Sequence, residues 1–401
     1  MLSPAEAEKL ILEAMPLAPT EKSPIAEAHG RVLRAGIRAE RDLPPFDRAT
    51  MDGYALRSAA VAEGVSRFRI EAVQAAGQPP RALGAEREAC VEIMTGAPLP
   101  AGADAVVPYE ETSRDDAIMI LAPGRIFAPG SAVHRRGSDH RAGETVVQAG
   151  TRLTGREIAV AAACGCASLE VSRQPAIAVI ATGDELVEVD TAVAAHQIRR
   201  SNDYALAAAL AQAGYPRVER FHLRDVRREV EDLLRRVLAE YEVILLTGGV
   251  SKGKFDLVPA ELERQGVRKV FHGVAQRPGK PFWFGVGPGR QPVFALPGNP
   301  VSSYIGLHRY VLPALAAAAG LVVPPPRRVA LAAAFTFEPK LTRFLPVALV
   351  ERPEGGQQAA PVPGNTSGDF AGLVGTDGFV ELPPELAEFP PGYVAPFRPW
   401  S

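Results

Sequence analysis

Six apolar residues open the stretch Ala-Ile-Ala-Val-Ile-Ala-Thr-Gly-Asp-Glu at positions 176–185. A continuous apolar run of this length is typical of a strand that is buried on both faces of a parallel sheet. Similar runs occur at 243–247 and 292–296, and helical patterns at 202–213 and 226–240 lie between the strands. Strands that alternate with helices predict βαβ units and an open, mostly parallel sheet.

The regions on either side of this α/β pattern have a different texture. The chain has 401 residues, more than one hydrophobic core usually supports, so we expect several domains. Residues 43–139 hold short alternating runs punctuated by Gly and Pro, which predict a small β-rich domain. Three prolines at 324–326 form a stiff linker, and short runs in 327–401 predict a second small β domain.

Composition restricts the classes of function. The formal net charge is -2, so no bulk positive field argues for nucleic acid or an anionic membrane. The longest apolar run, 311–323, contains Pro313 and is too short to span a bilayer. Acidic residues fall where the apolar core of a signal peptide would lie. Residues 3–6 instead predict a capping box that begins a helix. Three cysteines form no disulfide framework, so we expect a cytoplasmic protein.

Four loops of the predicted α/β domain combine Gly or Pro with polar or charged groups: 181–185, 247–251, 277–281 and 296–300. In an open parallel sheet, ligands bind outside the carboxyl ends of the strands, where such loops meet. Glycines let the backbone approach a ligand, and exposed N–H groups near helix starts favour anions. One such loop is more often a tight turn, but four at one end predict a crevice for an anionic, phosphate-bearing small molecule.

Each charged side chain in these loops has two interpretations. Arg277 and Lys280 suit an anion, or else they lie in solvated turns. Glu185 and Asp256 would supply the oxygen ligands that Mg²⁺ prefers when it bridges to phosphates. Each of these acids could instead cap a helix, and so could Asp225, which precedes the 226–240 helix.

One motif suggests a different class of protein, a P-loop NTPase, but it lacks a residue that this class requires. Residues 248–254 have the spacing of a Walker A loop, but Phe255 stands where that motif needs Ser or Thr to bind Mg²⁺. The seven histidines show no paired zinc-ligand spacing, and no GxSxG elbow is present. A P-loop NTPase, zinc hydrolysis and acyl transfer are therefore unsupported.

The motifs as a set resemble those of the molybdopterin molybdenumtransferases, the MoeA family, to which the E domain of gephyrin is similar. The matching segments follow the family's order and span most of the chain: 44–55, 93–100, 135–139, 182–185, 201–202, 248–251, 278–281 and 296–302. The most specific are Phe-Asp-Arg-Ala-Thr-Met-Asp-Gly-Tyr-Ala at 46–55 and Pro-Gly-Asn-Pro-Val-Ser at 297–302.

The resemblance implies an elongated homodimer with four domains per chain. These are a linker and dimerisation domain (1–42 with 140–173), a β-rich domain (43–139), an α/β molybdopterin-binding domain (174–323) and a C-terminal β domain (324–401). It implies molybdate and adenylylated molybdopterin as substrates, a divalent cation such as Mg²⁺, insertion of molybdenum at the dithiolene, and release of AMP. Molybdopterin adenylyltransferase and proteins of molybdoenzyme maturation are the partners it suggests.

The resemblance also gives roles to numbered positions. The catalytic candidates are Asp52, Thr95, Asp139, Glu185, Asp225 and Asp256, of which the last three are also the metal-binding carboxylates. The substrate-binding candidates are Thr182, Gly183, Asp184, Ser201, Asn202, Gly248, Gly249, Ser251, Pro297, Gly298 and Asn299. The molybdate candidates are Arg277, Lys280, Ser302, Arg343 and Ser367, and a doubly charged oxyanion is indeed best met by Arg, Lys and hydroxyl donors. In the family the β-rich domain of the other subunit closes the cleft, so Asp52 and Thr95 are expected to act across the dimer interface.

Three positions depart from the family pattern. Lys254 replaces a carboxylate, Asp203 replaces a small residue, and Arg277 stands where Lys is common. Two other functions stay open: a non-catalytic scaffold of the same fold that binds peptides, and the related adenylyltransferase reaction. The retained carboxylates argue against the scaffold, and the two added β domains favour the transferase.

Overall fold

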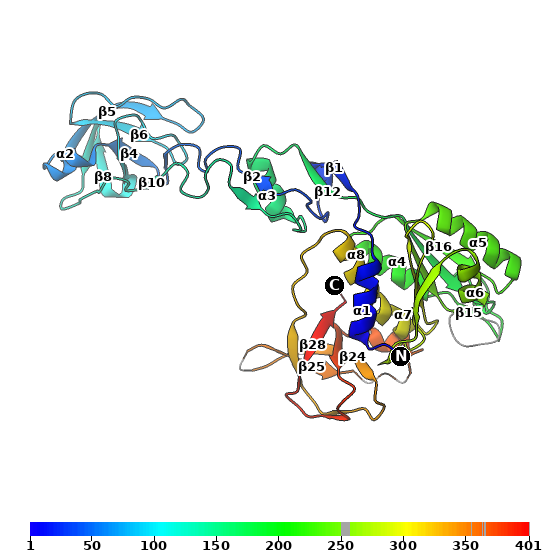
Figure 1. Cartoon of the computed structure of the whole chain (residues 1–401). Helices are drawn as coiled ribbons and strands as arrows, with labels where there is room; N and C mark the ends of the chain where they lie inside the picture. The colour runs from blue at the N-terminus through cyan, green and yellow to red at the C-terminus, as the bar shows by residue number, and fades with distance from the viewer. Residues whose placement is uncertain (250–256, 354, 363, 365, 401) are drawn as a thin grey trace.

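The computed structural model describes residues 1–249, 257–353, 355–362, 364 and 366–400. The chain is elongated, with a β-rich lobe at one end, the α/β and C-terminal domains at the other, and a small middle domain between them (Figure 1). The chain passes out to the lobe and back again through this middle domain. Within the described ranges, no helix combines the length and the apolar character needed to cross a bilayer.

The α/β domain is built on one six-stranded sheet with the order β16-β13-β17-β21-β20-β18. The first four strands are parallel, whereas β20 and β18 are antiparallel to their neighbours. The mostly parallel sheet expected from the sequence is therefore confirmed, and β20 is the one strand of these six that runs opposite to the others. The bounds are β13 Ile177–Thr182, β16 Val218–Leu223, β17 Val243–Thr247, β18 Arg268–His272, β20 Trp283–Val286 and β21 Pro292–Leu296.

Helices cover both faces of this sheet. Ile177 and Val179 of β13 belong to one core, and the alternate residues Ala178 and Ile180 belong to the other. This double burial explains why the strand is apolar at every position. The first core includes residues of α4 (Asn202–Gln212) and of the continuous helix α7 (Pro300–Gly306), η3 (Leu307–Val311) and α8 (Leu312–Ala318). The second includes α5 (Arg227–Glu240) and α6 (Leu257–Arg264).

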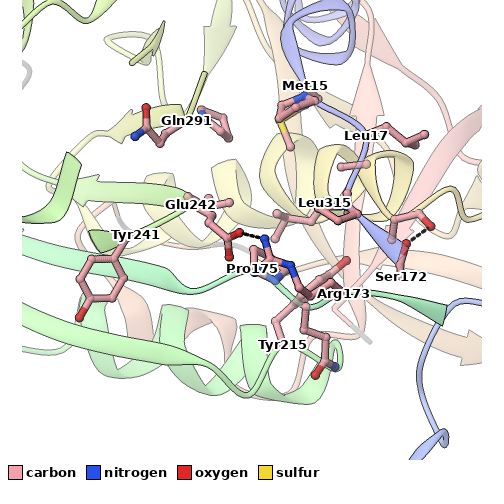
Figure 2. A pocket seen from close by; sticks show the side chains of 18 of the residues that line it. Met15, Leu17, Ser172, Arg173, Pro175, Tyr215, Tyr241, Glu242, Gln291 and Leu315 are labelled. Atoms are coloured by element: carbon pink, nitrogen blue, oxygen red, sulfur yellow. Dashed lines mark hydrogen bonds and ion pairs between the residues drawn. The ribbon is translucent and has the colours of Figure 1, made fainter. Parts of the chain in front are cut away.

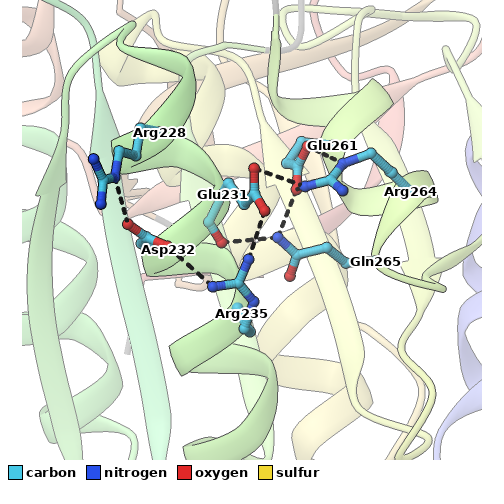
Figure 3. Close-up of polar contacts among 7 residues, drawn as sticks. All are labelled: Arg228, Glu231, Asp232, Arg235, Glu261, Arg264 and Gln265. Atoms are coloured by element: carbon cyan, nitrogen blue, oxygen red, sulfur yellow. Dashed lines mark hydrogen bonds and ion pairs between the residues drawn. The ribbon is translucent and has the colours of Figure 1, made fainter.

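Ion pairs and hydrogen bonds join α5 to α6 on the surface (Figure 3). Arg264 of α6 lies 3.0 Å from Glu231 of α5, and the Gln265 amide donates to the Glu231 carbonyl at 2.8 Å. Arg264 also hydrogen-bonds Glu261 and thereby lowers the pKa of that carboxyl. Single exposed pairs contribute little to stability, but this network fixes the C-terminal end of α6 against α5.

The first helix, α1 (Pro4–Ala14), has the expected capping box, because Ser3 and Glu6 satisfy each other's backbone N–H groups. Its buried residues Ala7 and Ile11 pack in the first core of the α/β domain, so α1 packs with that domain although the chain continues directly into the middle domain. Sequence continuity alone had grouped it with the linker. The middle domain consists of β1 (Thr20–Pro24), η1 (Ile25–Glu27), β2 (Ile37–Arg38), β11 (Thr145–Val147), α3 (Gly155–Ala163) and β12 (Ser168–Ser172).

The β-rich lobe has its own sheet, in the order β7-β4-β6-β5-β9-β8, and its own core around Tyr54 and Phe68. Its helices are α2 (Ser58–Ala62) and η2 (Tyr109–Glu111). Its strands are β3 (Arg48–Ala49), β4 (Gly53–Leu56), β5 (Arg67–Gln74), β6 (Ala89–Ile93), β7 (Ala105–Pro108), β8 (Thr112–Asp115), β9 (Ile118–Leu121) and β10 (Val133–His134).

The C-terminal domain is a closed β-barrel, because β24 pairs with both β25 and β26 while β22 and β28 complete the ring. A short strand of the α/β domain, β19 (Gln276–Arg277), adds to this barrel beside β24. The bounds are β22 Arg328–Leu331, β23 Phe335–Thr336, β24 Thr342–Glu351, β25 Gln357–Pro361, η4 Phe370–Leu373, β26 Gly378–Leu382, β27 Glu388–Phe389 and β28 Val394–Pro399. The β19–β24 pairing therefore brings a loop of one domain against the other.

Candidate functional site

The four loops singled out in the sequence begin at one edge of the α/β sheet. β13, β17 and β21 run in parallel register and end together, at Thr182, Thr247 and Leu296. β20 runs the other way, and its first residue, Trp283, lies beside Ala295 near the end of β21. The loop before β20 therefore reaches the same edge as the loops that follow the parallel strands.

Close backbone contacts hold three of these loops together. Gly248 has φ +94°, and a Cβ atom on it would lie 2.6 Å from the Thr182 hydroxyl oxygen and 2.9 Å from the Thr182 carbonyl oxygen. A Cβ on Gly298 would lie 3.3 Å from the Cα of Gly248. Glycine is required at Gly248 because neither this φ nor this approach suits a larger residue.

Asn202 connects the same loops through its side chain. Its amide donates to the Thr247 hydroxyl at 2.9 Å and to the Gly298 carbonyl at 2.7 Å. Its Oδ1 atom is buried and has no hydrogen-bond partner among the described residues. That oxygen is an available acceptor beside the N-terminus of α4, where backbone N–H groups favour an anion.

A cavity of about 510 Å³, the strand-end cavity, is enclosed by these loops. Ten of the residues proposed from the sequence line it: Thr182, Gly183, Glu185, Ser201, Asn202, Asp225, Gly248, Gly249, Gly298 and Asn299. Asp184 does not line it, and instead accepts a hydrogen bond at 3.0 Å from the backbone N–H of Asp225. Ser251 lies outside the described residues.

A second cavity of about 800 Å³, the interdomain cavity, lies between the α/β domain and the C-terminal barrel. It shares Asn299 with the strand-end cavity, so the two are neighbours. Its lining includes Pro297 and all five molybdate candidates, Arg277, Lys280, Ser302, Arg343 and Ser367. Asn299 donates a hydrogen bond to the Ser367 hydroxyl at 2.8 Å, which ties the two domains together at this point.

The interdomain cavity is rich in positive charge. The β19–β24 register sets Arg277 beside Arg343, and both guanidinium groups lie over the ring of Phe337, at 6.0 and 5.4 Å. Burial, followed by the like charge of Arg277, lowers the pKa of Arg343. Within the described part of the chain, Arg277, Lys280 and Arg343 form no ion pair with a carboxylate. Glu338 and Asp369 also line the cavity, but among the described residues the three cations are not neutralised by an ion pair with either, and such cations suit an anion.

Two of the three carboxylates proposed from the sequence, Glu185 and Asp225, line the strand-end cavity, together with Asp203. Glu185 is exposed, and its carboxyl group lies over Gly183, where a Cβ atom would come within 2.4 Å of it. Asp225 lines the same cavity, whereas Asp256 lies outside the described residues. In the part of the chain that is described, no group of three His, Cys, Asp or Glu side chains could hold a metal ion.

The remaining candidates lie in the β-rich lobe. Asp52 accepts hydrogen bonds from Thr95, and Asp139 lies 2.9 Å from His134. No residue of 43–139 lines either cavity, and the lobe lies at the far end of the molecule (Figure 1). Within one chain, these three residues are therefore not brought to the loops of the α/β domain.

Two arginines of the strand-end cavity were not anticipated. Arg199 and Arg200 line it, and Arg200 pairs with Asp203, which is 0% exposed and also lies 3.1 Å from Arg220. The acid that departs from the family pattern is thus a buried counter-ion for two arginines. The signal in the sequence was the pair Arg199-Arg200 directly before the Ser-Asn motif, at a predicted helix start.

A further cavity of about 360 Å³ lies at the opposite end of the strands, where residues 15–19 and 172–175 connect the domains (Figure 2). Its lining is largely apolar, and Arg173 pairs there with Glu242. None of the proposed site residues lines it. Ligands of open α/β sheets bind at the carboxyl ends of the strands, so this cavity is not the candidate site.

The fold and the site define a class of protein: an α/β protein with glycine-rich loops and acids in one cavity and clustered cations in the next. Family models match in sequence order: "MoeA N-terminal region (domain I and II)" at 2–165, "Probable molybdopterin binding domain" at 178–317 and "MoeA C-terminal region (domain IV)" at 328–400. The chain belongs to the MoeA family, the molybdopterin molybdenumtransferases of molybdenum cofactor biosynthesis.

Full-length relatives agree with this membership. The chain is 39% identical over 402 residues to the molybdopterin molybdenumtransferase of Synechocystis, with 100% of both chains covered. It is 32% identical to that of Bacillus subtilis, covering 91% of this chain and 86% of the relative. Among solved structures, the moeA protein of Pyrococcus horikoshii OT3 has a TM-score of 0.84 at 25% identity, with 100% of both chains covered.

Proposed function

We propose that this chain inserts molybdenum from molybdate into adenylylated molybdopterin and releases AMP. The observation that carries the proposal is the adjacency of the two cavities, which share Asn299. One has glycine loops suited to phosphates and carboxylates suited to a bridging cation, and the other has three cations that form no ion pair among the described residues. A molecule whose phosphates bind in the strand-end cavity would extend its other end toward an oxyanion bound in the interdomain cavity.

Thr182, Gly183, Gly248 and Gly298 would hold the phosphates, since they line the cavity and their glycines let the backbone approach a ligand closely. Arg199 and Arg200 line the same cavity and would add positive charge. Asn202 would act twice, by fixing the Thr247 and Gly298 loops and by offering its unpaired oxygen to a donor on the substrate.

Mg²⁺, or another divalent cation, fits the donors of the strand-end cavity. Glu185 and Asp225 line it, and Mg²⁺ is usually held by one or two carboxylates together with substrate phosphates rather than by a full protein cage. Asp256 remains a proposed third carboxylate outside the described residues. When bound, such an ion would neutralise charge released on cleavage of the phosphoanhydride.

Molybdate would bind in the interdomain cavity as a substrate. Arg277 and Arg343 offer planar guanidinium groups and Lys280 a compact charge, and Ser302 and Ser367 add hydroxyl groups. Molybdate would bind with little rearrangement of these groups, because Arg277 and Arg343 already lie side by side.

We further propose a homodimer in which Asp52, Thr95 and Asp139 serve the cavities of the other subunit. Asp52 and Thr95 are exposed, held to each other, and distant from the cavities of their own chain. Supply of adenylylated molybdopterin by an adenylyltransferase and delivery to maturation proteins fit this reaction. The described cysteines are all free, which fits a reducing cytoplasm.

The two alternatives make different demands on the site. A scaffold that binds peptides has no use for three clustered cations that form no ion pair among the described residues, next to a phosphate-binding cavity. An adenylyltransferase would need a nucleotide site but no oxyanion site.

The deciding experiment incubates the purified chain with adenylylated molybdopterin and Mg²⁺ and follows AMP with and without molybdate. We expect AMP release that depends on molybdate. No release under either condition would favour the scaffold. Adenylylation of molybdopterin by ATP would favour the adenylyltransferase instead.

A further inference from the structure

Gln276 is a buried polar residue directly before the loop that carries Arg277 and Lys280, here called the cation loop (277–280). It is 2% exposed and forms β19 together with Arg277. None of the motifs that relate the chain to its family includes it, since the matching segment begins at Pro278. Buried polar side chains are normally hydrogen-bonded, so both ends of its amide group need partners.

Both ends of the Gln276 amide do have partners. The Nε2 group donates to the carbonyl of Gly279, inside the cation loop, at 3.2 Å. The Oε1 atom accepts a hydrogen bond from the hydroxyl of Tyr310. The Gly279 carbonyl sets the orientation of the amide, because a carbonyl can only accept and must therefore face the NH₂ group. The tyrosine hydroxyl is left as the donor to Oε1.

Tyr310 is itself held firmly. It is 1% exposed and its ring lies 5.0 Å from that of Phe282. The next residue back, Arg309, lies 2.9 Å from Glu8 of α1 and 2.9 Å from Glu381 of the C-terminal barrel. The hydroxyl that reaches Gln276 therefore comes from a point where three parts of the chain meet.

The backbone adds two further bonds around the cation loop. Val274 donates to the Lys280 carbonyl at 3.0 Å, and Thr342 donates to the Ala275 carbonyl at 3.0 Å. Gly279 has φ +91°, and a Cβ atom on it would lie 2.8 Å from Gln276 Nε2, so the amide lies directly against the loop. Gln276 is thus the side chain that spans the inside of the loop.

We propose that the Gln276–Tyr310 pair positions Arg277 and Lys280, so that they face the interdomain cavity together with Arg343 before an oxyanion binds. Like charges repel, and a loop without an internal support would let the cations separate. The pair keeps them close, and the anion then binds without first having to order the loop. Gln276 and Tyr310 are positioning residues. This inference rests on the proposed function, and in particular on an oxyanion as substrate.

The test replaces Gln276 by Met, which keeps the volume and removes both hydrogen bonds, and Tyr310 by Phe, which removes only the hydroxyl. We expect the half-saturating molybdate concentration for AMP release to rise about fivefold to tenfold in each variant, with kcat at saturating molybdate within about twofold of the parent. Tyr304→Phe is the matched control, because Tyr304 lies on the same helix, packs against Phe370 and Trp400, and lines neither cavity. An unchanged molybdate requirement in both test variants overturns the proposal.

A double-mutant cycle separates positioning from a general loss of structure. If Gln276 acts through the cation loop, Gln276→Met should weaken molybdate affinity much less when Lys280 is already Ala. Its effect on thermal unfolding should be the same in both backgrounds. Equal losses of affinity in the two backgrounds would overturn the proposal, since Gln276 would then act independently of Lys280.

Calorimetric binding of molybdate alone distinguishes this inference from the proposed function. Weaker molybdate binding in Gln276→Met supports the positioning role even if the parent chain releases no AMP, in which case only the proposed reaction fails. Unchanged binding in an otherwise active parent overturns the positioning role and leaves the reaction standing.

Discussion

The Asp52 carboxylate accepts hydrogen bonds from both the backbone N–H and the hydroxyl of Thr95, at 2.6 and 2.9 Å. The backbone bond, followed by the hydroxyl bond, lowers the pKa of Asp52 below its ordinary value. Both residues are exposed on the β-rich lobe. The lobe therefore presents an acid held in a fixed position, with a lowered pKa, that does not line the cavities of its own chain.

Removal of the Thr95 hydroxyl should reverse part of the lowering of the Asp52 pKa. In Thr95→Val the backbone bond remains, so we expect the pKa of Asp52 to rise but to stay below its ordinary range. A carboxyl whose pKa is lower in the folded than in the unfolded state stabilises the fold at neutral pH, and this stabilisation is lost as the pH falls through the folded-state pKa. Because the shift is smaller in the variant, the variant should lose less stability than the parent on acidification. NMR titration of the Asp52 carboxyl measures the pKa, and an identical value in parent and variant would contradict the assignment.

Asp52→Asn should remove the charge and keep the shape. We expect AMP release to fall at least about tenfold, which corresponds to about 1.4 kcal/mol of lost transition-state stabilisation. Asp115→Asn is the matched control, since Asp115 is an exposed acid of the same lobe that pairs with Arg67 at 3.6 Å. Equal activities in the two variants would exclude Asp52 from the site.

Gly248→Ala should disturb the strand-end cavity more than an ordinary glycine substitution. Gly266→Ala is the control, because Gly266 has a similar φ of +87° but only an ordinary contact, 3.9 Å from Pro288. The control should lose about 1–2 kcal/mol of stability from backbone strain. Gly248→Ala should lose more, because Thr182 must move, and activity should fall with it. Thermal unfolding and AMP release measure both effects, and equal behaviour of the two variants would contradict the close packing.

His308 should make the fold sensitive to mild acid. Burial lowers the pKa of His308 to about 4, and its Nε2 atom has no partner among the described residues. The unfolded chain then binds the proton more readily, so stability falls as the pH drops from about 6.5 toward 4. Between pH 7 and 5 this one group should cost about 2 kcal/mol of unfolding free energy. His308→Leu should remove that component, which urea unfolding at the two pH values would detect.

Much of the fold followed from local sequence physics. The apolar run at 177–182 is explained by burial on both faces, and the Gly248 and Gly298 loops meet because parallel strands end at one edge. The packing of α1 on the α/β core could not be predicted from the sequence. A pattern of apolar residues shows that one face of a helix is buried, but it does not show which domain covers that face. The acidic partners of the buried residues Arg200 and Arg309 were hidden for the same reason, because Asp203, Glu8 and Glu381 look like ordinary surface acids in sequence.

Lys280→Ala should raise the molybdate concentration needed for half-maximal AMP release at least about tenfold, which is 1.4 kcal/mol of binding. Lys269→Ala is the control, because Lys269 is an exposed lysine of the same domain that pairs with Glu263 at 2.9 Å and lines neither cavity. It should leave the requirement unchanged. A parallel shift in both variants would mean that net charge, rather than the cation loop, sets the affinity.

Whether the lobe of one subunit serves the cavities of another can be tested by mixing inactive chains. Asp52→Ala and Lys280→Ala homodimers should each be impaired. If each site combines Asp52 of one chain with Lys280 of the other, a mixed dimer has one site with both substitutions and one site with neither. Random mixing gives about half mixed dimers, so activity at low molybdate should recover to about a quarter of the parent level. If each chain used its own Asp52, every site in a mixed dimer would carry one substitution, and mixing would restore nothing. The distance of the lobe from the cavities of its own chain leads us to expect the recovery.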